Sequence, residues 1–485
     1  MNAPQPVNPV LSIPAELQSC FDKQRAAYLA NPEPSYEQRR ADLDKLAQML
    51  KDNREELIAA INKDYGNRST FETLFAEFFV VLEEIKDNAK HLKKWMKPQK
   101  RKIDMMVYPT SKNLVVPQPL GVIGVIVPWN FPLNLAFCPI AAAFAAGNRA
   151  MIKMSENSNH LAQLLISITP KYFSSEKLQF FADSGGIGPA FSSLPFDHMF
   201  FTGSGLTGRA VMASCARNLT PVTLELGGKS PAIVGPDYPV ETAVDRIMWV
   251  KAFNAGQICT NVDYVFLPEG KEEAFTKEAQ RVLAERYPDI NGQDYTSIID
   301  ERSYRRLQAT LDDAVAKGAR AVNLFPNQTP DASKRKFPIT AVFNVTDDME
   351  IMQREIFGPL LPVKTYRTRE EVAAYVNKRD RPLALYPFTN DRDLQNYYIT
   401  HIMSGGVSIN TALLHVAQHD MPFGGVGGSG MGHYHGHEGF LTFSKLRPIY
   451  QQGPLSATSF MLPPYSRNTL LQPMKLINLM IKLKS

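Results

Sequence analysis

Cys259 is the residue whose surroundings most strongly suggest chemistry. It ends the stretch FNAGQIC at 253–259, where a glycine-containing bend leads to the thiol and Thr260 follows it. A thiol behind such a bend can lie in a cleft close to backbone N–H groups, which favour the reactive thiolate. A lone cysteine is nevertheless more often buried and inert. Two further residues, Glu225 in LELGGK and Asn130 in PWNFP, make a catalytic role for Cys259 the better interpretation.

A second motif predicts a dinucleotide site. The segment TGSGLTG at 202–208 follows an expected strand and opens an expected helix, and its glycines fit the pattern G-x-G-x-x-G. The helix N-terminus can face a phosphate, although a tight turn that needs positive φ explains the glycines nearly as well. Glu225 suits a cleft at a domain boundary better than a ribose contact. The better ribose candidate is KMSE at 153–156, with an ordinary helix start capped by Ser155 as its alternative.

The apolar pattern predicts an α/β fold in two units. Helical periodicity runs through 15–97, a hairpin-like pair of strands is expected in 101–116, and a buried β-branched strand follows at 121–127. Strands then alternate with helices to about 223, and the alternation restarts with a strand at 231–234, as is typical of βαβ units. Further strands are expected at 150–153, 180–182, 199–201, 264–267, 321–324, 362–366 and 406–410.

Composition and charge argue against several classes of protein. The net charge of +5, from 53 basic and 48 acidic residues, gives no sign of nucleic-acid binding. The four cysteines lack close pairing, which suits a reducing compartment, so we expect a cytoplasmic protein. The uncharged stretch 113–148 is long enough to span a membrane. Prolines interrupt it repeatedly, and the apolar segment 474–483 is too short, so we expect no membrane span.

Taken together, six motifs resemble the NAD(P)-dependent aldehyde dehydrogenase superfamily over nearly the whole chain. They are PWNFP at 128–132, FTGSGLTG at 201–208, LELGGKSP at 224–231, FNAGQICT at 253–260, EIFGP at 355–359 and PFGGVGGSGMG at 422–432. The closing SGMGHYHGHEGF resembles the class 3 branch, and DYGNRS at 64–69 looks most like its bacterial coniferyl-aldehyde dehydrogenase group. The resemblance implies a Rossmann-like cofactor domain, an α/β catalytic domain and a small bridging β-hairpin.

The resemblance also implies domain ranges and an assembly. The NAD-binding domain would comprise 1–97 and 119–223, and the catalytic domain 224–425. Residues 98–118 and 426–485 would form the arm that pairs two subunits as a homodimer.

The roles of the site residues follow from the same resemblance. Cys259 would attack the aldehyde carbon, Asn130 would donate to the resulting oxyanion, and Glu225 would activate the water that hydrolyses the thioester. The cofactor would be NAD, held by Pro128 and Trp129 at the wall, Lys153 and Glu156 at the adenine ribose, Gly203, Ser204 and Gly208 at the pyrophosphate turn, and Glu355 and Phe357 at the nicotinamide side. Glu156 should favour NAD over the 2′-phosphate of NADP, whose use stays open.

The expected substrate is a hydrophobic aldehyde of the cinnamyl or benzyl type, with a medium- or long-chain fatty aldehyde as the alternative. A dehydrogenase that acylates coenzyme A is a rival, but such relatives tend to lack the base that Glu225 provides. A cysteine hydrolase is another rival, but no histidine is patterned with Cys259. A third is a non-catalytic protein that kept the fold.

Two further features of the sequence each allow a structural and a functional interpretation. His433, His435 and His437 alternate, but no cysteine or acidic residue is patterned with them, so we expect no metal site. Trp249 is expected in the core, and its alternative is the lining of an aromatic substrate pocket.

Overall fold

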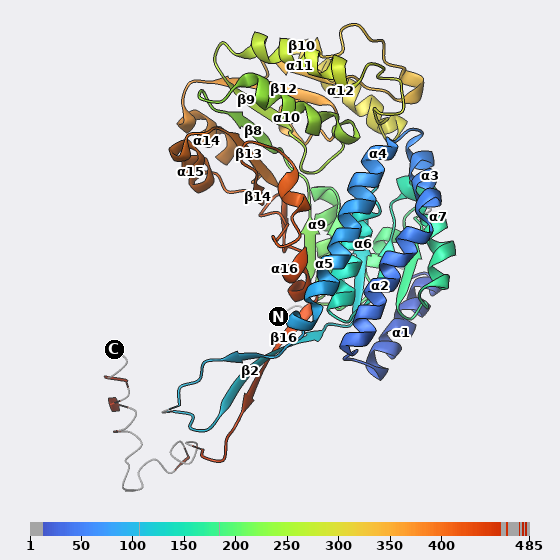
Figure 1. Ribbon diagram of the computed structural model, residues 1–485, viewed down its shortest axis with the longest axis vertical. Coiled ribbons are helices and arrows are strands. Elements are labelled where there is room, and N and C mark those ends of the chain that lie inside the picture. Colours follow the sequence, from blue (N-terminus) through green and yellow to red (C-terminus); the bar gives the residue numbers. More distant parts are fainter. Residues whose placement is uncertain are drawn as a thin grey trace, which may run out of the picture.

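The chain folds into two α/β units and a projecting arm (Figure 1). The computed structural model describes residues 13–105, 107–183, 185–456, 462–463, 475, 478–479 and 481–482. Half of the predicted apolar segment 474–483 therefore lies outside the described residues. Within the described part of the chain, no helix is long and apolar enough to cross a membrane.

The first unit is built on a six-stranded sheet of strand order β15-β7-β6-β3-β4-β5. Its strands are β3 Val122–Ile126, β4 Arg149–Lys153, β5 Leu178–Phe181, β6 His198–Thr202, β7 Val222–Glu225 and β15 Gly430–Met431. All pairs are parallel except β15 with β7. Every residue of β3 and β6 is buried, which explains their unbroken apolar sequences.

Helices cover this sheet on both faces. The N-terminal helices are α1 Ala15–Ala30, α2 Tyr36–Asp52, α3 Arg54–Tyr65, α4 Thr70–Thr73, the π-helix η1 Leu74–Phe79 and α5 Val80–Trp95. The helices between the strands are α6 Asn134–Ala145, α7 Asn159–Ile168, α8 Ile187–Ser192 and α9 Gly205–Ala216. Short 3-10 turns lie at Glu156–Ser158 and Thr169–Lys171. The helix α6 is buried over nearly its whole length, so the uncharged stretch that contains it is core.

The second unit is built on a seven-stranded sheet of order β10-β11-β12-β9-β8-β13-β14. Its strands are β8 Pro231–Val234, β9 Tyr264–Pro268, β10 Arg320–Asn323, β11 Thr340–Phe343, β12 Leu360–Tyr366, β13 Ala384–Phe388 and β14 Gly406–Val407. Its helices are α10 Val240–Ala252, α11 Glu272–Arg286, α12 Glu301–Ala316, α13 Glu350–Gln353, α14 Arg369–Asn377 and α15 Arg392–His401. Short 3-10 turns lie at Phe253–Gly256, Ala332–Lys334 and Leu414–Ala417. The predicted α/β fold with parallel sheets is confirmed.

Two strands of this sheet were not predicted from the sequence. They are β11 and the central strand β13, which pairs with β8 in parallel. Pro387 lies inside β13 and Pro382 just before it, and prolines argue against a central strand. Pro387 lacks an N–H but still pairs through its carbonyl, which accepts a hydrogen bond from Asn410 N at 2.8 Å.

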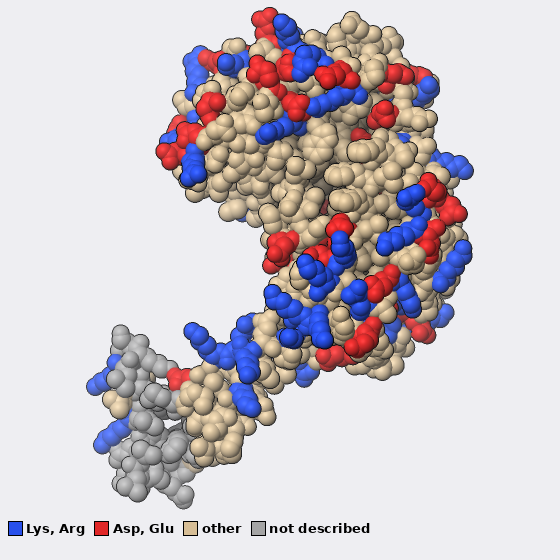
Figure 2. All heavy atoms as spheres, in the orientation of Figure 1, with Lys and Arg blue, Asp and Glu red and all other residues tan. Residues whose placement is uncertain are grey.

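The arm is a three-stranded antiparallel sheet formed by β1 Gln99–Arg101, β2 Lys112–Pro119 and β16 Ser444–Gln451. A hairpin is present, but its first strand ends at Arg101, before most of the predicted range 101–116, and β16 adds a third strand from the C-terminal part of the chain. Residues 430–442, which the sequence assigned to the arm, lie elsewhere. They form β15 and α16 Gly436–Thr442, and α16 packs on α5 and α6 of the first unit. Lys and Arg side chains gather where the arm leaves the body (Figure 2), and those at 93–94, 97 and 100–102 are exposed.

Candidate active site

The loop that carries Cys259 has an unusual backbone. After α10 ends, Asn254, Ala255 and Gly256 adopt φ values of 50°, 50° and 73°, all in the left-handed region. A Cβ on Gly256 would lie 2.4 Å from the carbonyl oxygen of Gly358, so only glycine fits there. The buried Asn254 Nδ2 donates to the Gln257 carbonyl at 3.1 Å and to Tyr65 Oη at 3.3 Å. Such strain persists only where surrounding contacts enforce it, and here it fixes the position of the thiol.

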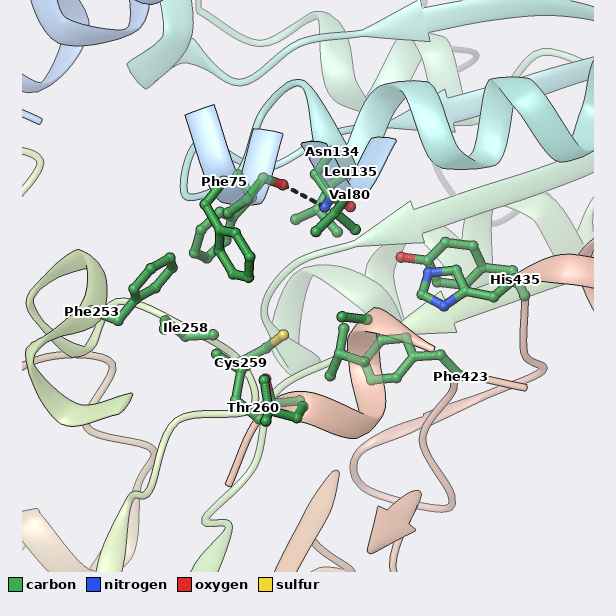
Figure 3. A pocket seen from close by; sticks show the side chains of 17 residues that line it. Phe75, Val80, Asn134, Leu135, Phe253, Ile258, Cys259, Thr260, Phe423 and His435 are labelled. Atoms are coloured by element: carbon green, nitrogen blue, oxygen red, sulfur yellow. Dashed lines mark hydrogen bonds between the residues drawn. The ribbon is translucent and has the colours of Figure 1, made fainter. Parts of the chain in front are cut away.

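Cys259 lies in the wall between two cavities. One is an apolar cavity, and Figure 3 shows the Sγ atom of Cys259 pointing into it. The other is a polar cleft that Cys259 shares with Asn130, Glu225 and Glu355. The surface between the two α/β units, where these cavities lie, is largely uncharged in Figure 2. The three residues singled out from the sequence therefore meet around one thiol.

The thiol itself is less acidic than we expected. Burial, and then the carboxyls of Glu355 and Glu225, raise the pKa of Cys259 to about 12, while the backbone N–H groups of Thr260 and Cys259 act in the opposite direction. The expectation that the bend alone favours the thiolate is thus wrong, because burial and two carboxylates outweigh two N–H groups. A positive charge brought next to the sulfur would reverse this balance.

Asn130 follows β3 in the loop 128–132 and is only 2% exposed. Its Nδ2 donates to the carbonyl of Gln257 at 3.3 Å, and Gln257 is two residues before the thiol. An amide nitrogen carries two protons, so one remains for an oxygen bound near Cys259. Asn130 thus has the chemistry of an oxyanion donor.

A buried ion pair holds the Asn130 loop in place. Arg68 Nη1 donates to Glu77 Oε1 at 2.9 Å and to the carbonyl of Asn130 at 2.7 Å. Both charged side chains are fully buried. Glu77 Oε2 accepts from the backbone N–H groups of Leu133 and Asn134 at 2.8 and 2.9 Å, at the start of α6. The pair therefore clamps both sides of the loop.

Replacing Arg68 by Met should lower both stability and activity. Glu77 would be left buried without its charge partner, and breaking such a pair costs about 3–5 kcal/mol in the free energy of unfolding. The Asn130 carbonyl would also lose its donor, so kcat should fall. Urea unfolding and aldehyde oxidation measure the two effects. The matched control is Arg281→Met, whose exposed pairs with Glu278 and Glu285 should contribute less than about 1 kcal/mol. Equal effects of the two substitutions would contradict the clamp.

Glu225 ends β7 and is 3% exposed. Neither carboxyl oxygen has a hydrogen-bond partner among the described residues, and burial raises its pKa well above the ordinary value. Such an unsatisfied carboxyl is costly in a protein that only needs stability, and it is typical of a general acid or base.

Glu355 lies on the opposite side of the cleft, against the double glycine of LELGGK. A Cβ on Gly227 would lie 1.9 Å from Glu355 Oε2, so this glycine allows the close approach. Burial, and then the charge of Asp263, raise the pKa of Glu355 to about 8. Its Oε1 has no partner among the described residues, so one oxygen is free for a ligand hydroxyl.

The polar cleft contains most of the predicted cofactor residues. Pro128, Trp129, Gly203, Ser204, Glu355 and Phe357 line it, whereas Gly208 packs below it against Leu226. Trp129 and Phe357 meet edge to face, with ring centroids 5.4 Å apart. Ser204 caps α9 by accepting from Thr207 N at 3.3 Å. The free Glu355 oxygen, the orphaned Thr202 Oγ1 and the glycine turn at a helix N-terminus fit a dinucleotide.

Lys153 and Glu156 lie outside the residues that line this cleft. Lys153 Nζ pairs with Asp183 at 2.5 Å, and both side chains are largely buried. Glu156 is exposed at the start of the turn after β4. Sequence reasoning missed Asp183, and also Ser303, Arg306 and Arg354 of the cleft. Asp183, Ser303 and Arg306 lie outside the recognised motifs, whereas Arg354 directly precedes EIFGP but was not included with it.

The apolar cavity on the other side of Cys259 is mostly aromatic and aliphatic. Its walls include Phe75, Phe131, Leu135, Phe253, Leu413 and Phe423. The π-helix η1 supplies Phe75 and Ala76, in line with the tendency of π-helical turns to occur at functional sites. Trp249 does not line the cavity but lies behind Phe253, with centroids 5.9 Å apart. It is thus a packing residue, the first of its two interpretations.

The three alternating histidines have separate environments. His433 is exposed, His435 is buried in the wall of the apolar cavity, and His437 packs against Trp95 with centroids 5.6 Å apart. Among the described residues, no group of three His, Cys, Asp or Glu side chains could hold a metal ion.

The chain is similar to known dehydrogenases over most of its length. The aldehyde dehydrogenase family model matches residues 11–449. A probable coniferyl aldehyde dehydrogenase of Pseudomonas aeruginosa is 48% identical over 93% of this chain and 94% of that protein. A coniferyl aldehyde dehydrogenase of a Pseudomonas species is 42% identical over 93% and 94%.

The fold is similar to solved structures as well. The substrate-bound state of the Staphylococcus aureus protein AldH superposes with a TM-score of 0.89, at 32% identity, over 96% of this chain and 99% of that one. The resemblance inferred from the motifs is confirmed by this match and by the 439-residue span of the family model, 11 to 449 inclusive. The chain belongs to the aldehyde dehydrogenase family, whose members are NAD(P)-dependent oxidoreductases.

Proposed function

We propose that this protein oxidises hydrophobic aromatic aldehydes of the cinnamyl or benzyl type to carboxylic acids, with reduction of NAD(P). The main support for this proposal is the position of Cys259. Its thiol lies between an aromatic-lined cavity and a polar cleft that fits a dinucleotide. An aldehyde in the cavity and a nicotinamide in the cleft would then meet at one sulfur. The names of the relatives support an aromatic substrate.

The first step is attack of Cys259 Sγ on the aldehyde carbon, which forms a C–S bond and an oxyanion. The thiol proton passes to solvent in the open polar cleft that Cys259 lines. Asn130 Nδ2 and the backbone N–H of Cys259 stabilise the oxyanion, which such preorganised donors do at no reorganisation cost. NAD(P), which Trp129, Ser204 and Glu355 of the cleft would hold, would supply the acceptor for the hydride that leaves the carbon. The product on Cys259 is a thioester.

The second step is hydrolysis of that thioester. Glu225, once deprotonated, takes a proton from water, and the hydroxide attacks the acyl carbon. The bond to Sγ breaks, and the carboxylic acid leaves through the apolar cavity. Burial of Glu225 suits this role because it raises the pKa of the carboxyl and makes it a stronger base.

The cofactor preference, the assembly and the location belong to the same proposal. The exposed carboxylate of Glu156 and the Lys153–Asp183 pair at the end of β4 favour the free ribose hydroxyls of NAD over a 2′-phosphate.

A homodimer through the arm is supported by β16, an edge strand with exposed Leu446, Ile449 and Tyr450. The four free cysteines support the cytoplasm. The domain ranges stay a prediction.

A panel of aldehydes tests the proposal. We expect cinnamaldehyde and benzaldehyde to give a higher kcat/KM than saturated aldehydes of six to ten carbons, which are the alternative substrates, and a lower KM for NAD than for NADP. NADH absorbance measures both. A preference for the saturated aldehydes would favour the fatty-aldehyde alternative. Product formation that depends on coenzyme A, or ester hydrolysis without NADH formation, would favour the two rival reactions.

A further inference from the structure

His435 is a polar residue in an otherwise apolar cavity wall. It is 5% exposed, and its Nδ1 has no hydrogen-bond partner among the described residues. Of the side chains that line the cavity, only His435 has a buried polar atom left unpaired. The amide of Asn134, which also lines the cavity, has a partner, because Asn134 Nδ2 donates to the Ala76 carbonyl at 2.7 Å. Buried polar atoms are normally paired, so the unpaired Nδ1 is available to a hydrogen-bonding group of a ligand in the cavity.

The imidazole is held firmly in this position. It stacks on Phe423, with ring centroids 5.6 Å apart and an angle of 21° between the planes. His435 precedes α16, and its carbonyl accepts from Gly439 N at 2.9 Å, while the next residue donates to Glu84 Oε1 at 3.1 Å. Its φ of 83° is in the region that favours glycine, yet a histidine occupies it. Figure 3 shows the ring turned into the cavity, across from the Cys259 sulfur.

The ring is uncharged in this environment. Burial lowers its pKa, and His419 lowers it further, whereas the buried carboxylate of Glu84 acts in the opposite direction. That carboxylate is already occupied by His419 Nδ1 at 2.9 Å and by Asn88 Nδ2 at 2.8 Å. A neutral imidazole offers one acceptor and one donor nitrogen. It therefore suits a neutral hydroxyl rather than a carboxylate or a cation.

We propose that His435 determines specificity for aromatic aldehydes that carry a ring hydroxyl, which it binds through Nδ1 at the end of the cavity opposite Cys259. This proposal rests on the proposed function and adds the substrate class to it. With the aldehyde carbon at Cys259 and the aromatic ring between Phe75 and Phe423, the far edge of the ring faces His435. A substrate without the hydroxyl leaves the nitrogen unpaired, and this is the physical origin of the discrimination.

Two substrates that differ by one hydroxyl test the proposal. We expect kcat/KM of the native enzyme to be at least about tenfold higher for 4-hydroxycinnamaldehyde than for cinnamaldehyde. His435→Phe should lower kcat/KM for 4-hydroxycinnamaldehyde more than that for cinnamaldehyde and so remove this preference, because it removes Nδ1 but keeps a ring that can stack on Phe423. His435→Gln should retain part of the preference through its amide. His433→Phe, in the same segment but exposed, should leave both values unchanged.

The possible outcomes distinguish a failure of the role proposed for His435 from a failure of the proposed function. An equal fall for both aldehydes in His435→Phe would show a structural role and overturn the assignment, as would a native enzyme that does not distinguish them. Oxidation of neither aldehyde by the native enzyme, with turnover of saturated aldehydes, would instead overturn the proposed function. Loss of the preference in His433→Phe would also count against His435.

Discussion

Cys259→Ala is expected to abolish NADH formation from every aldehyde, with a fall in kcat of about 10⁴-fold or more. Alanine has no group that can form the covalent bond, and among the described residues no other cysteine lines the two cavities. The substitution should leave folding intact, because Cys259 is only partly buried and alanine removes a single atom. The rate is measured by NADH absorbance at saturating aldehyde and cofactor.

The control for this result is Cys215→Ala. Cys215 is fully buried in α9, and its Sγ donates to the carbonyl of Ser192 at 3.7 Å. Its loss should cost some stability but leave kcat near the native value. Unchanged NADH formation in Cys259→Ala would refute covalent catalysis by this thiol.

Glu225→Gln should separate the two halves of the reaction. Acylation would still release one equivalent of NADH per active site, but hydrolysis of the thioester would lose its base. We expect a burst followed by a steady-state rate about 10²–10⁴-fold below that of the native enzyme. Stopped-flow absorbance measures the burst, and mass spectrometry of the quenched enzyme should show the acyl group on Cys259. Glu241→Gln, at an exposed position of α10, is the matched control and should behave as the native enzyme.

The pH dependence gives a second test of the same residue. Burial raises the pKa of Glu225, so at low pH the carboxyl is protonated and cannot accept a proton from water. The steady-state rate of the native enzyme should therefore rise as the pH increases through that pKa. In Glu225→Gln this rise in the hydrolysis step should vanish. A Gln variant with neither a burst nor an acyl-enzyme would place Glu225 in the first step, as the base that removes the thiol proton.

Much of the fold was predictable because it depends on local patterns. The buried strand at 121–127 and the alternation after it follow from side-chain periodicity, and both units are α/β. The strand β13 was missed because its prolines contradict local preference, and only pairing with β8 makes it a strand. The position of α16 was missed for a similar reason. Its packing on α5 and α6 depends on residues about 300 positions or more away in the chain, as the bond between Gly436 and Glu84 illustrates.

The sequence by itself determined which residues meet: Cys259, Glu225 and Asn130 each stand in a motif whose order and spacing identify the family. Only the tertiary structure decided how they behave. The Cys259 thiol is made less acidic by burial and by two carboxylates from distant segments, and the Asn130 loop is clamped by Arg68 and Glu77. His435 is a candidate for specificity only because folding places its unpaired nitrogen in the cavity wall. Residue types and spacing specify chemistry, whereas pKa values and pairing depend on the solvent and charges that folding removes or brings together.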